Sequence, residues 1–219
     1  MDKVDLEERL LEGASRLGIQ VPEGAVAPLL RYLEELLRWN QKVNLTAVRD
    51  PAQALEVHLL DSMAVWPEIR GARTLLDLGA GGGLPGLVLK LLEPGLELVL
   101  VDSVAKKVGF LKHAIAALGL QGAKAVHARA EGSPETEGLP WAEVVISRAL
   151  MELPEWIELG SKYVAPGGRL VAMLGKAPAD SEVLARQHGF ARVILRGYAL
   201  PFSGATRHVA VLERARTPV

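Results

Sequence analysis

The stretch LLDLGAGGGLPG, residues 75–86, passes from an apolar run into a series of glycines and then a proline. Gly81, Gly83 and Gly86 match the G-x-G-x-x-G spacing of dinucleotide-binding turns that join a strand to a helix. Glycines allow positive φ angles and let backbone N–H groups approach a ligand closely. The spacing therefore predicts a turn that binds a small ligand, and it suits NAD, a phosphate or an adenosyl cofactor equally well.

Around this turn, short apolar runs alternate with stretches of helical spacing. Strands are expected at residues 74–79, 96–102, 123–128, 142–147 and 168–174. Helices are expected between them, at residues 87–92, 104–118, 153–163 and 181–188. This alternation predicts an α/β fold with a doubly wound, mostly parallel, Rossmann-like sheet. Two more strands, residues 191–200 and 206–214, are separated only by the turn-rich PFSGA, which predicts a C-terminal antiparallel hairpin and a total of seven strands.

The first seventy residues have helical patterns. One apolar stripe ends at Gly18, a second follows Pro22 and Pro28, and a third helix is expected from Pro51. The sequence therefore predicts an N-terminal helical extension, residues 1–70, packed on an α/β core, residues 71–219.

The composition excludes several classes of protein. The chain has 219 residues, a net charge of -1 and 49% hydrophobic residues, which predicts a compact protein with one main core. It has no cysteine, so disulfides, thiolate metal sites, iron–sulfur clusters and cysteine nucleophiles are excluded, and no metal site is predicted. The N-terminus lacks the apolar region of a signal peptide and no apolar run reaches the ~20 residues of a membrane span. We therefore expect a cytoplasmic protein without a membrane partner.

Two acidic residues flank the predicted ligand site. Asp102 ends the second strand, where an acceptor for ribose hydroxyls is expected. Asp77 lies inside the first strand, where NAD sites usually have apolar residues. It suits a ligand with a cationic amino-acid end, or a role in orienting the turn. The alternative is that the glycines form only a tight turn and Asp102 caps the following helix.

Together with the terminal hairpin, these features resemble the class I S-adenosylmethionine-dependent methyltransferases. The blocks RWNQKVNLTAV, HLLDSM, LVDSVAKKVGFL, ARAE, VISRAL, APGGRL and RHVAVLE, which extend from Arg38 to Glu213, resemble more closely the bacterial ribosomal RNA small-subunit methyltransferase G family, also called glucose-inhibited division protein B. LPG after the glycines and SRA after the fourth strand are specific to that family. The block AMLGKA departs from its usual Met-Lys-Gly and displaces Lys176, to which we carry over no role.

The resemblance implies that residues 71–219 bind S-adenosylmethionine, release S-adenosylhomocysteine and methylate guanine N7 in small-subunit (16S) ribosomal RNA. The sequence is compatible with this chemistry, because it lacks the cysteine of pyrimidine carbon-5 methyltransferases and has SRALMELP in place of the Asn/Asp-Pro-Pro-aromatic loop of amine methyltransferases. Guanine N7 carries a lone pair and no proton, so alignment suffices without a general base. A proton-bearing oxygen would need a base, for which His127 and His208 are candidates, although we expect a structural or surface role for each.

The cofactor contacts are assigned by position along the strands. The residues expected at the methionine end are Gly79, Gly81, Gly83 and Leu84. Asp102 is expected at the ribose, and Ala130 and Glu131 beside the adenine, although Glu131 would also suit a solvated helix cap. Arg148 follows the fourth strand, where the target base must enter. The resemblance marks it as a cofactor or RNA contact, and it is our candidate catalytic residue through positioning, since a planar guanidinium grips a phosphate or stacks on a base.

The remaining assignments concern RNA. Candidate phosphate contacts around the site are Arg129, Arg196, Arg207 and His208. Polar residues within apolar stripes, which predict a buried network or helix caps, are Asn44, Thr46, His58, Asp61 and Ser62. Of these, Asn44 is a further candidate RNA contact.

Two other functions compete with RNA methylation. A small-molecule methyltransferase would share the cofactor site and carry a lid over its substrate, a role open to the N-terminal helices. A non-catalytic cofactor-binding module would have a degraded glycine turn, whereas the turn of this chain is intact. We expect a monomer that acts on the RNA or on the assembling small subunit.

Overall fold

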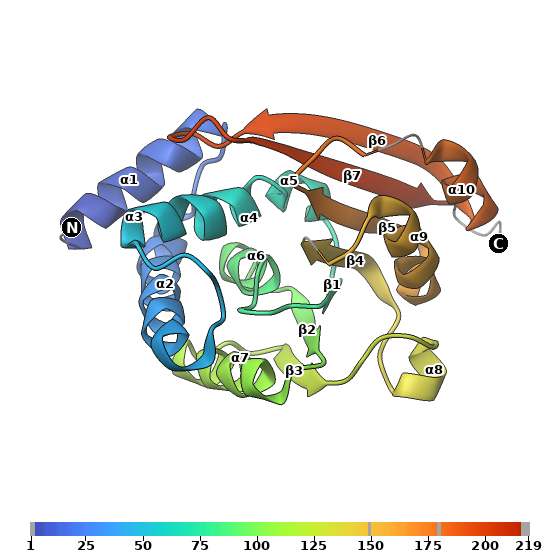
Figure 1. Ribbon diagram of the computed structural model, residues 1–219, viewed down its shortest axis with the longest axis horizontal. Coiled ribbons are helices and arrows are strands. Elements are labelled where there is room, and N and C mark those ends of the chain that lie inside the picture. The colour runs from blue at the N-terminus through green and yellow to red at the C-terminus, as the bar shows by residue number, and fades with distance from the viewer. Residues whose placement is uncertain (1–2, 149, 179–180, 216–219) are drawn as a thin grey trace.

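The computed structural model describes residues 3–148, 150–178 and 181–215, which form an α/β fold with helices on both faces of a central sheet (Figure 1). The sheet has seven strands in the order β3-β2-β1-β4-β5-β7-β6. The strands are β1 (Thr74–Leu78), β2 (Glu97–Asp102), β3 (Ala123–His127), β4 (Ala142–Arg148), β5 (Val164–Leu174), β6 (Phe190–Ala199) and β7 (Thr206–Arg214). β1 to β5 pair in parallel, and β7 lies antiparallel between β5 and β6. The predicted parallel sheet with a terminal antiparallel hairpin is confirmed.

The helices also follow the predicted order, with some additions. They are α1 (Lys3–Arg16), α2 (Glu23–Val43), α3 (Pro51–Ala54), the π-helix η1 (Leu55–Leu60), α4 (Asp61–Met63), α5 (Trp66–Ile69), α6 (Gly86–Leu92), α7 (Ala105–Ala117), α8 (Pro134–Glu137), α9 (Leu153–Gly160), the 3-10 helix η2 (Ser161–Tyr163) and α10 (Glu182–Gln187). α2 begins at Glu23 and continues through Pro28. It tolerates the proline because Pro28 removes only the bond to the carbonyl of Gly24, a residue exposed to solvent.

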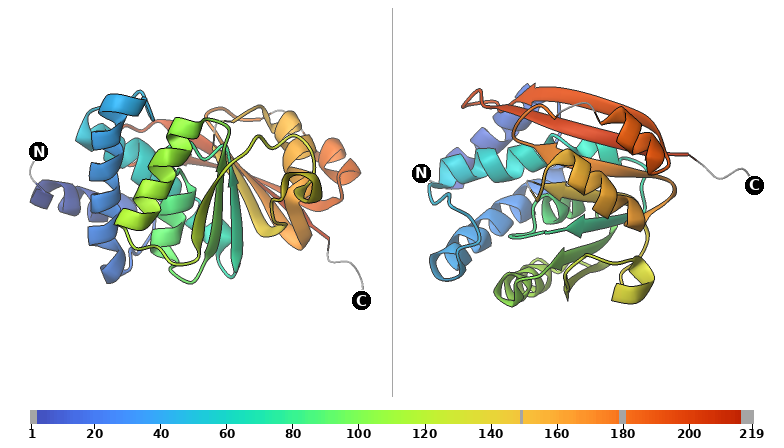
Figure 2. Two further views of the ribbon diagram at one scale, coloured as in Figure 1. Left: turned by 90° about the horizontal axis from the view of Figure 1, so that it is seen from below. Right: turned by 45° about the vertical axis from the view of Figure 1, so that its right-hand side comes forward.

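Alternation along the strands divides the apolar side chains between two cores. Leu75, Leu100 and Ile146 face the core shared with α1, α2, η1, α6 and α7. Leu76, Val101 and Val145 face the opposite core, shared with α9 and α10. Because successive strand residues point to opposite faces, a parallel sheet covered on both sides needs the nearly continuous apolar runs that these strands have. Figure 2 shows the two helical layers from the side.

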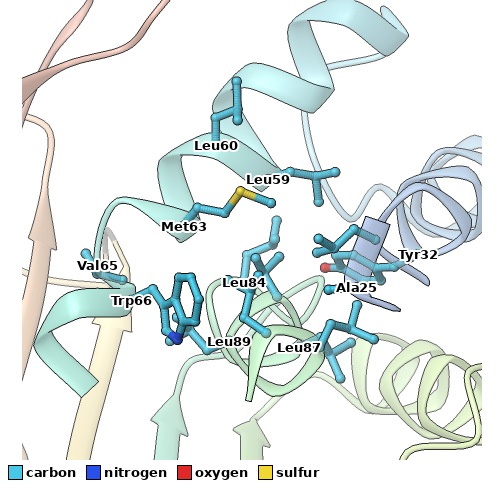
Figure 3. Close-up of a cluster of buried hydrophobic side chains, with 14 of the residues drawn as sticks. Ala25, Tyr32, Leu59, Leu60, Met63, Val65, Trp66, Leu84, Leu87 and Leu89 are labelled. Carbon is cyan, nitrogen blue, oxygen red and sulfur yellow. The ribbon is translucent and has the colours of Figure 1, made fainter. Parts of the chain in front are cut away.

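The N-terminal helices are part of the first core. Figure 3 shows Leu59 and Met63, from η1 and α4, in one cluster with Leu84, which precedes α6, and Leu87 in its first turn. The Glu56 carboxylate in η1 accepts backbone N–H bonds at 2.7 Å from Phe202 and Ser203, in the turn of the C-terminal hairpin. The extension therefore contacts both the sheet's helical layer and the hairpin, although a domain boundary near residue 70 stays a prediction.

Candidate active site

A cavity of about 740 Å³ lies where β1, β2 and β4 end. Most of its lining comes from four segments: the glycine turn after β1, the end of β2, residues 128–131 after β3, and the segment after β4. Leu45 after α2, Lys107 of α7 and Leu159 of α9 also line it. The carboxyl ends of neighbouring parallel strands are where open α/β sheets bind ligands. The strands thus bring residues far apart in the sequence to one site.

The glycine turn is shaped by positive φ angles and by backbone hydrogen bonds. Gly79, Gly81 and Gly83 have φ of 73°, 56° and 89°. The N–H groups of Gly79 and Ala80 both donate to the carbonyl of Val101 at 2.9 Å, which attaches the turn to β2. A Cβ at Gly81 would meet only one atom within 4 Å, at 3.9 Å, so the turn leaves open space there. The turn therefore offers backbone to the cavity without obstruction.

Gly83 has a different role from its neighbours. It is not among the residues that line the cavity. A Cβ at Gly83 would collide with Leu87 and come within 3.1 Å of Leu111, so a side chain has no room against α6 and α7. The glycine spacing thus combines residues that face the cavity with one that allows close helix packing.

Two buried groups support the turn from behind. The Tyr32 hydroxyl of α2 donates to the carbonyl of Gly82 at 2.6 Å. Asp77 is fully buried, and its Oδ2 accepts the N–H of Gly86 at 2.9 Å. Burial raises the pKa of the Asp77 carboxyl to about 7, although the Gly86 bond and the charge of Arg148 oppose the shift. Asp77 does not line the cavity, so of its two predicted roles the geometry agrees with orienting the turn.

Asp102 lies at the cavity edge with its carboxylate already bound to backbone. Oδ2 accepts the N–H of Gly81 at 2.9 Å, and Oδ1 accepts the N–H of Val104 at 2.8 Å, just before α7. Lys107 lies 3.9 Å from Oδ2. A carboxylate has about four acceptor positions, so two remain for a ligand. Asp102 therefore shapes the turn, supports the start of α7 and keeps acceptor capacity toward the cavity.

Residues 129–131 form the outer wall. Arg129 and Glu131 form an ion pair at 2.7 Å, and both side chains are exposed. The N–H groups of Glu131 and Gly132 donate to Glu137 Oε1 of α8, which orders this loop. Burial of the Glu137 carboxyl acts to raise its pKa. The hydrogen bonds that it accepts, from the Tyr163 hydroxyl and from these two N–H groups, outweigh burial and lower the pKa. Ala130 lies between the paired residues, on the wall of the cavity.

Arg148, at the end of β4, lines both this cavity and a second one of about 440 Å³. Its Nη1 donates to the carbonyl of Val57 at 2.9 Å and lies 3.6 Å from Oδ2 of Asp61. In a regular α-helix the Val57 carbonyl would accept the backbone N–H of Asp61. Here the Asp61 N–H donates instead to the carbonyls of Glu56 and His58. The π-helix thus frees a backbone acceptor for the guanidinium, and this acceptor holds Arg148 between the two cavities.

A model of the family described as rRNA small subunit methyltransferase G matches residues 26–209 of this chain. The chain belongs to this family. Ribosomal RNA small subunit methyltransferase G of Myxococcus xanthus (strain DK1622) is 55% identical over 216 residues, 98% of this chain and 100% of that protein. The protein of the same name from Anaeromyxobacter dehalogenans (strain 2CP-C) is 46% identical over 209 residues, 94% of this chain and 97% of that protein.

Solved structures agree on the fold. A SAM-dependent methyltransferase from Aquifex aeolicus has a TM-score of 0.57 at 17% identity, covering 78% of this chain and 96% of that one. The S-adenosylmethionine-dependent methyltransferase SibL, in its apo form, also has a TM-score of 0.57, at 16% identity and over 97% of this chain and 75% of that one. Family and fold together assign S-adenosylmethionine as the cofactor, as the sequence predicts. None of the helices in the described ranges combines the length and apolarity needed to cross a membrane.

In this member of the methyltransferase G family, most residues assigned to the cofactor line the first cavity. They are Gly79, Gly81, Leu84, Asp102, Ala130, Glu131 and Arg148. The segment after Arg148 contributes Leu150, which lies against Gly79, and Met151. Neither histidine considered as a base lines this cavity: His127 bonds the carbonyl of Ser103 at 3.0 Å, and His208 lies on β7.

The residues assigned to RNA have more varied surroundings. Arg129 is exposed on the wall of the first cavity. Arg207 lines the second cavity, with its Nε 3.8 Å from Oδ1 of Asp61. Arg196 donates at 2.9 Å to the carbonyl of Ala64 and to Glu68, so it joins β6 to α5. Arg196 is therefore already engaged within the protein.

Three further residues of the sequence analysis lie outside both cavities. Asn44 ends α2 in the left-handed region, with φ of 53°, and is exposed. His208 has a buried Nδ1 with no partner among the described residues. Lys176 is exposed and follows β5.

The polar residues within the apolar stripes form a partly connected network. The Thr46 hydroxyl bonds His58 Nε2 at 2.9 Å, and Asn40 bonds the backbone of Thr46 and Val48. Burial lowers the pKa of His58 to about 4, assisted by the charge of Arg148, so its imidazole is neutral at physiological pH. Ser62 Oγ has no hydrogen-bond partner within the described part of the chain.

Sequence reasoning missed Tyr32, Val57 and Tyr198. Tyr32 occupies an ordinary position in an apolar helical stripe, and Val57 acts through its carbonyl, so neither has a local signal. Tyr198 could have been noticed, because it is an aromatic residue with a polar hydroxyl in a predicted strand that also contains two arginines.

Proposed function

We propose that this protein transfers the methyl group of S-adenosylmethionine to N7 of a guanine in small-subunit ribosomal RNA. The observation that carries the proposal is the pair of cavities that share Arg148, one walled by the glycine turn and Asp102 and the other by the end of β5 and the hairpin. The relatives named ribosomal RNA small subunit methyltransferase G support RNA as the substrate.

The first cavity fits the cofactor. Open space at Gly81 and the positive φ angles of the turn suit the methionine end, beside Gly79 and Leu84. The two free acceptor positions of Asp102 suit the ribose hydroxyls. Ala130 and Glu131 would flank the adenine. Gly83 would contribute indirectly, by letting α6 pack close to the turn.

For this reaction the protein has mainly to align guanine N7 with the methyl group and sulfur of the cofactor. The bound cofactor supplies an electrophilic methyl group on a sulfonium, and guanine N7 attacks it with a lone pair already in the plane of the ring. No proton has to be removed, so no general base is required of the described residues that line the two cavities, among which His58 at the second cavity is the one histidine. Arg148 would position the base from the junction of the cavities, because it is fixed by the Val57 carbonyl.

The RNA would lie across the mouth of the site. Arg129 is the exposed cation best placed for a phosphate, and Arg207 lies at the second cavity. Arg196, His208 and Asn44 would act at the periphery. With a net charge of -1, phosphate attraction alone is weak, so we expect RNA shape or ribosomal proteins to contribute, and we expect a monomeric enzyme in the cytoplasm.

A small-molecule methyltransferase is less well supported, because the N-terminal helices are poorly suited to act as its lid. Those helices are fixed to the turn by Tyr32 and to the hairpin by Glu56, and they share the main core. They are therefore placed to support the site and not to open over it.

The test is a tritiated methyl-transfer assay on unmethylated bacterial small subunits and on protein-free small-subunit RNA, followed by nucleoside analysis. We expect N7-methylguanosine with the wild type and little with Arg148→Ala. Arg169→Ala is the matched control, since Arg169 also donates to backbone carbonyls, those of Glu68 and Arg70, but lines neither cavity. Cofactor binding without label in either RNA would favour the small-molecule enzyme.

A further inference from the structure

The second cavity has a mixed lining that no cofactor assignment uses. It lies between the π-helix, the ends of β4 and β5, and the C-terminal hairpin. Its apolar lining includes Val57, Met173 and Leu174, and its polar lining consists of His58, Asp61, Arg148, Tyr198 and Arg207. Apolar side chains that cover a ring, beside polar groups that fix its orientation, are the kind of lining that a small-molecule or base site uses.

Asp61 is the anionic group of this cavity and is buried, with 5% of its surface exposed. Its Oδ1 accepts the Tyr198 hydroxyl at 2.7 Å. The two arginines lie farther away, Arg148 at 3.6 Å from Oδ2 and Arg207 at 3.8 Å from Oδ1. Within the described residues, the Tyr198 hydroxyl is thus the one hydrogen-bond donor to this carboxylate. Burying a carboxylate with unused acceptor positions is costly, which indicates that a ligand supplies the missing donors.

We propose that the second cavity receives the target guanine and that Asp61 reads its Watson–Crick edge. The proposal rests on guanine-N7 methylation as the function. N1–H and N2–H lie across the ring from N7, so N7 faces the first cavity when those donors face Asp61. O6 then lies on the side of Arg148, which faces both cavities. Adenine presents an acceptor at N1, which the carboxylate repels, so Asp61 is a specificity-determining residue.

The same contact assists the reaction. The N7 lone pair forms the new N–C bond, the electron pair of the breaking C–S bond goes to sulfur, and no proton leaves. The guanine gains positive charge, which makes N1–H and N2–H stronger donors. The hydrogen bonds to Asp61 therefore strengthen as the methyl group moves, and an interaction that strengthens in the transition state raises the rate.

The experiment compares guanosine with inosine at the methylated position, after that position has been mapped in the wild-type product. Inosine keeps N7, O6 and N1–H but lacks the N2 amino group. We measure kcat/KM on reconstituted subunits for the wild type, Asp61→Asn and the control Glu68→Gln. Glu68 also pairs with an arginine, Arg196, at 2.9 Å, but lines neither cavity. Binding of S-adenosylhomocysteine by calorimetry checks that each variant has a folded cofactor site.

We expect the wild type and Glu68→Gln to prefer guanosine about tenfold or more, and Asp61→Asn to lose most of that preference while its rate on guanosine falls at least about tenfold. Equal wild-type rates on guanosine and inosine would overturn the proposal even if the variant failed to fold. An Asp61→Asn enzyme slowed equally on both substrates would overturn it too, because that result indicates structural support alone. Failure of the proposed function is a separate result, seen as no N7-methylguanosine with the wild type on guanosine RNA.

Discussion

The carboxylate of Asp77 accepts the backbone N–H of Gly86 at 2.9 Å, nine residues later, and so closes the glycine turn from inside the core. Asp77 is fully buried, and its second oxygen has no partner among the described residues. A protonated carboxyl suits this position better than a charged one, which is consistent with its raised pKa.

This relationship predicts a pH dependence of stability. Because the pKa rises from 3.8 unfolded to about 7 folded, the folded protein binds the proton more tightly. The contribution is full below pH ~4 and is lost as the pH rises through ~7, with a size on the order of 2–4 kcal/mol. Urea unfolding of the wild type and Asp77→Asn at several pH values measures it. Parallel curves for the two proteins would contradict the prediction, since the amide keeps the acceptor and does not titrate.

Removing the Tyr32 hydroxyl should affect both stability and cofactor affinity. Tyr32→Phe leaves the buried carbonyl of Gly82 without its donor, which costs about 1–3 kcal/mol. Because Gly82 lines the first cavity, the Kd for S-adenosylhomocysteine should also rise. The control is Thr74→Val, which removes a hydroxyl that accepts the N–H of Glu143 at the other end of β1. It should lower stability alone, and an equal loss of affinity in the control would count against the prediction.

Gly81 and Gly18 allow strain to be separated from binding. Their φ angles are similar, 56° and 71°. Alanine at either position should lower the free energy of unfolding by about 1–2 kcal/mol. A Cβ at Gly18 meets nothing within 4 Å, whereas one at Gly81 extends toward the cavity. Calorimetric titration should show weaker S-adenosylhomocysteine binding for Gly81→Ala only, and unchanged binding by that variant would remove Gly81 from the proposed site.

Arg129, which is exposed and positively charged, predicts that RNA binding depends on the salt concentration. Arg129→Ala should weaken binding to small-subunit RNA and reduce the slope of log K against log salt by about 1. Arg192 is the control, because it also forms an exposed ion pair, with Glu213 at 3.7 Å, but lies on β6 outside both cavities. Filter binding at several salt concentrations distinguishes the two, and the same loss in both variants would indicate general charge attraction.

The sequence could predict those parts of the fold and site that depend on local patterns. The strands and the main helices follow from apolar periodicity, and the glycine turn follows from residues 79–86, so both were found. Residues such as Asp102 and Ala130 could be placed because strand ends converge in a parallel sheet.

What could not be predicted depends on tertiary contacts. Arg148 and Val57 are 91 residues apart, and nothing in LEVHLL distinguishes a π-helix from a regular helix. Gly83 fits the spacing of a ligand contact, yet the packing of Leu87 and Leu111 gives it another role. The contacts of Arg196 with the Ala64 carbonyl and Glu68 could not be predicted either, because these partners are distant in the sequence.

Because Leu55–Leu60 is a π-helix, the positions of the side chains that follow it depend on the number of residues in this segment. A π-turn accommodates one residue more than an α-turn, so deletion of a single residue here would restore a regular helix. The Val57 carbonyl would return to the helical ladder, and every later side chain of α4 would rotate by about 100° relative to the preceding turn. Asp61 would then leave the second cavity, although no residue type near it had changed. A one-residue insertion or deletion in this segment should therefore disturb the second cavity more than a substitution at an exposed position of the same segment.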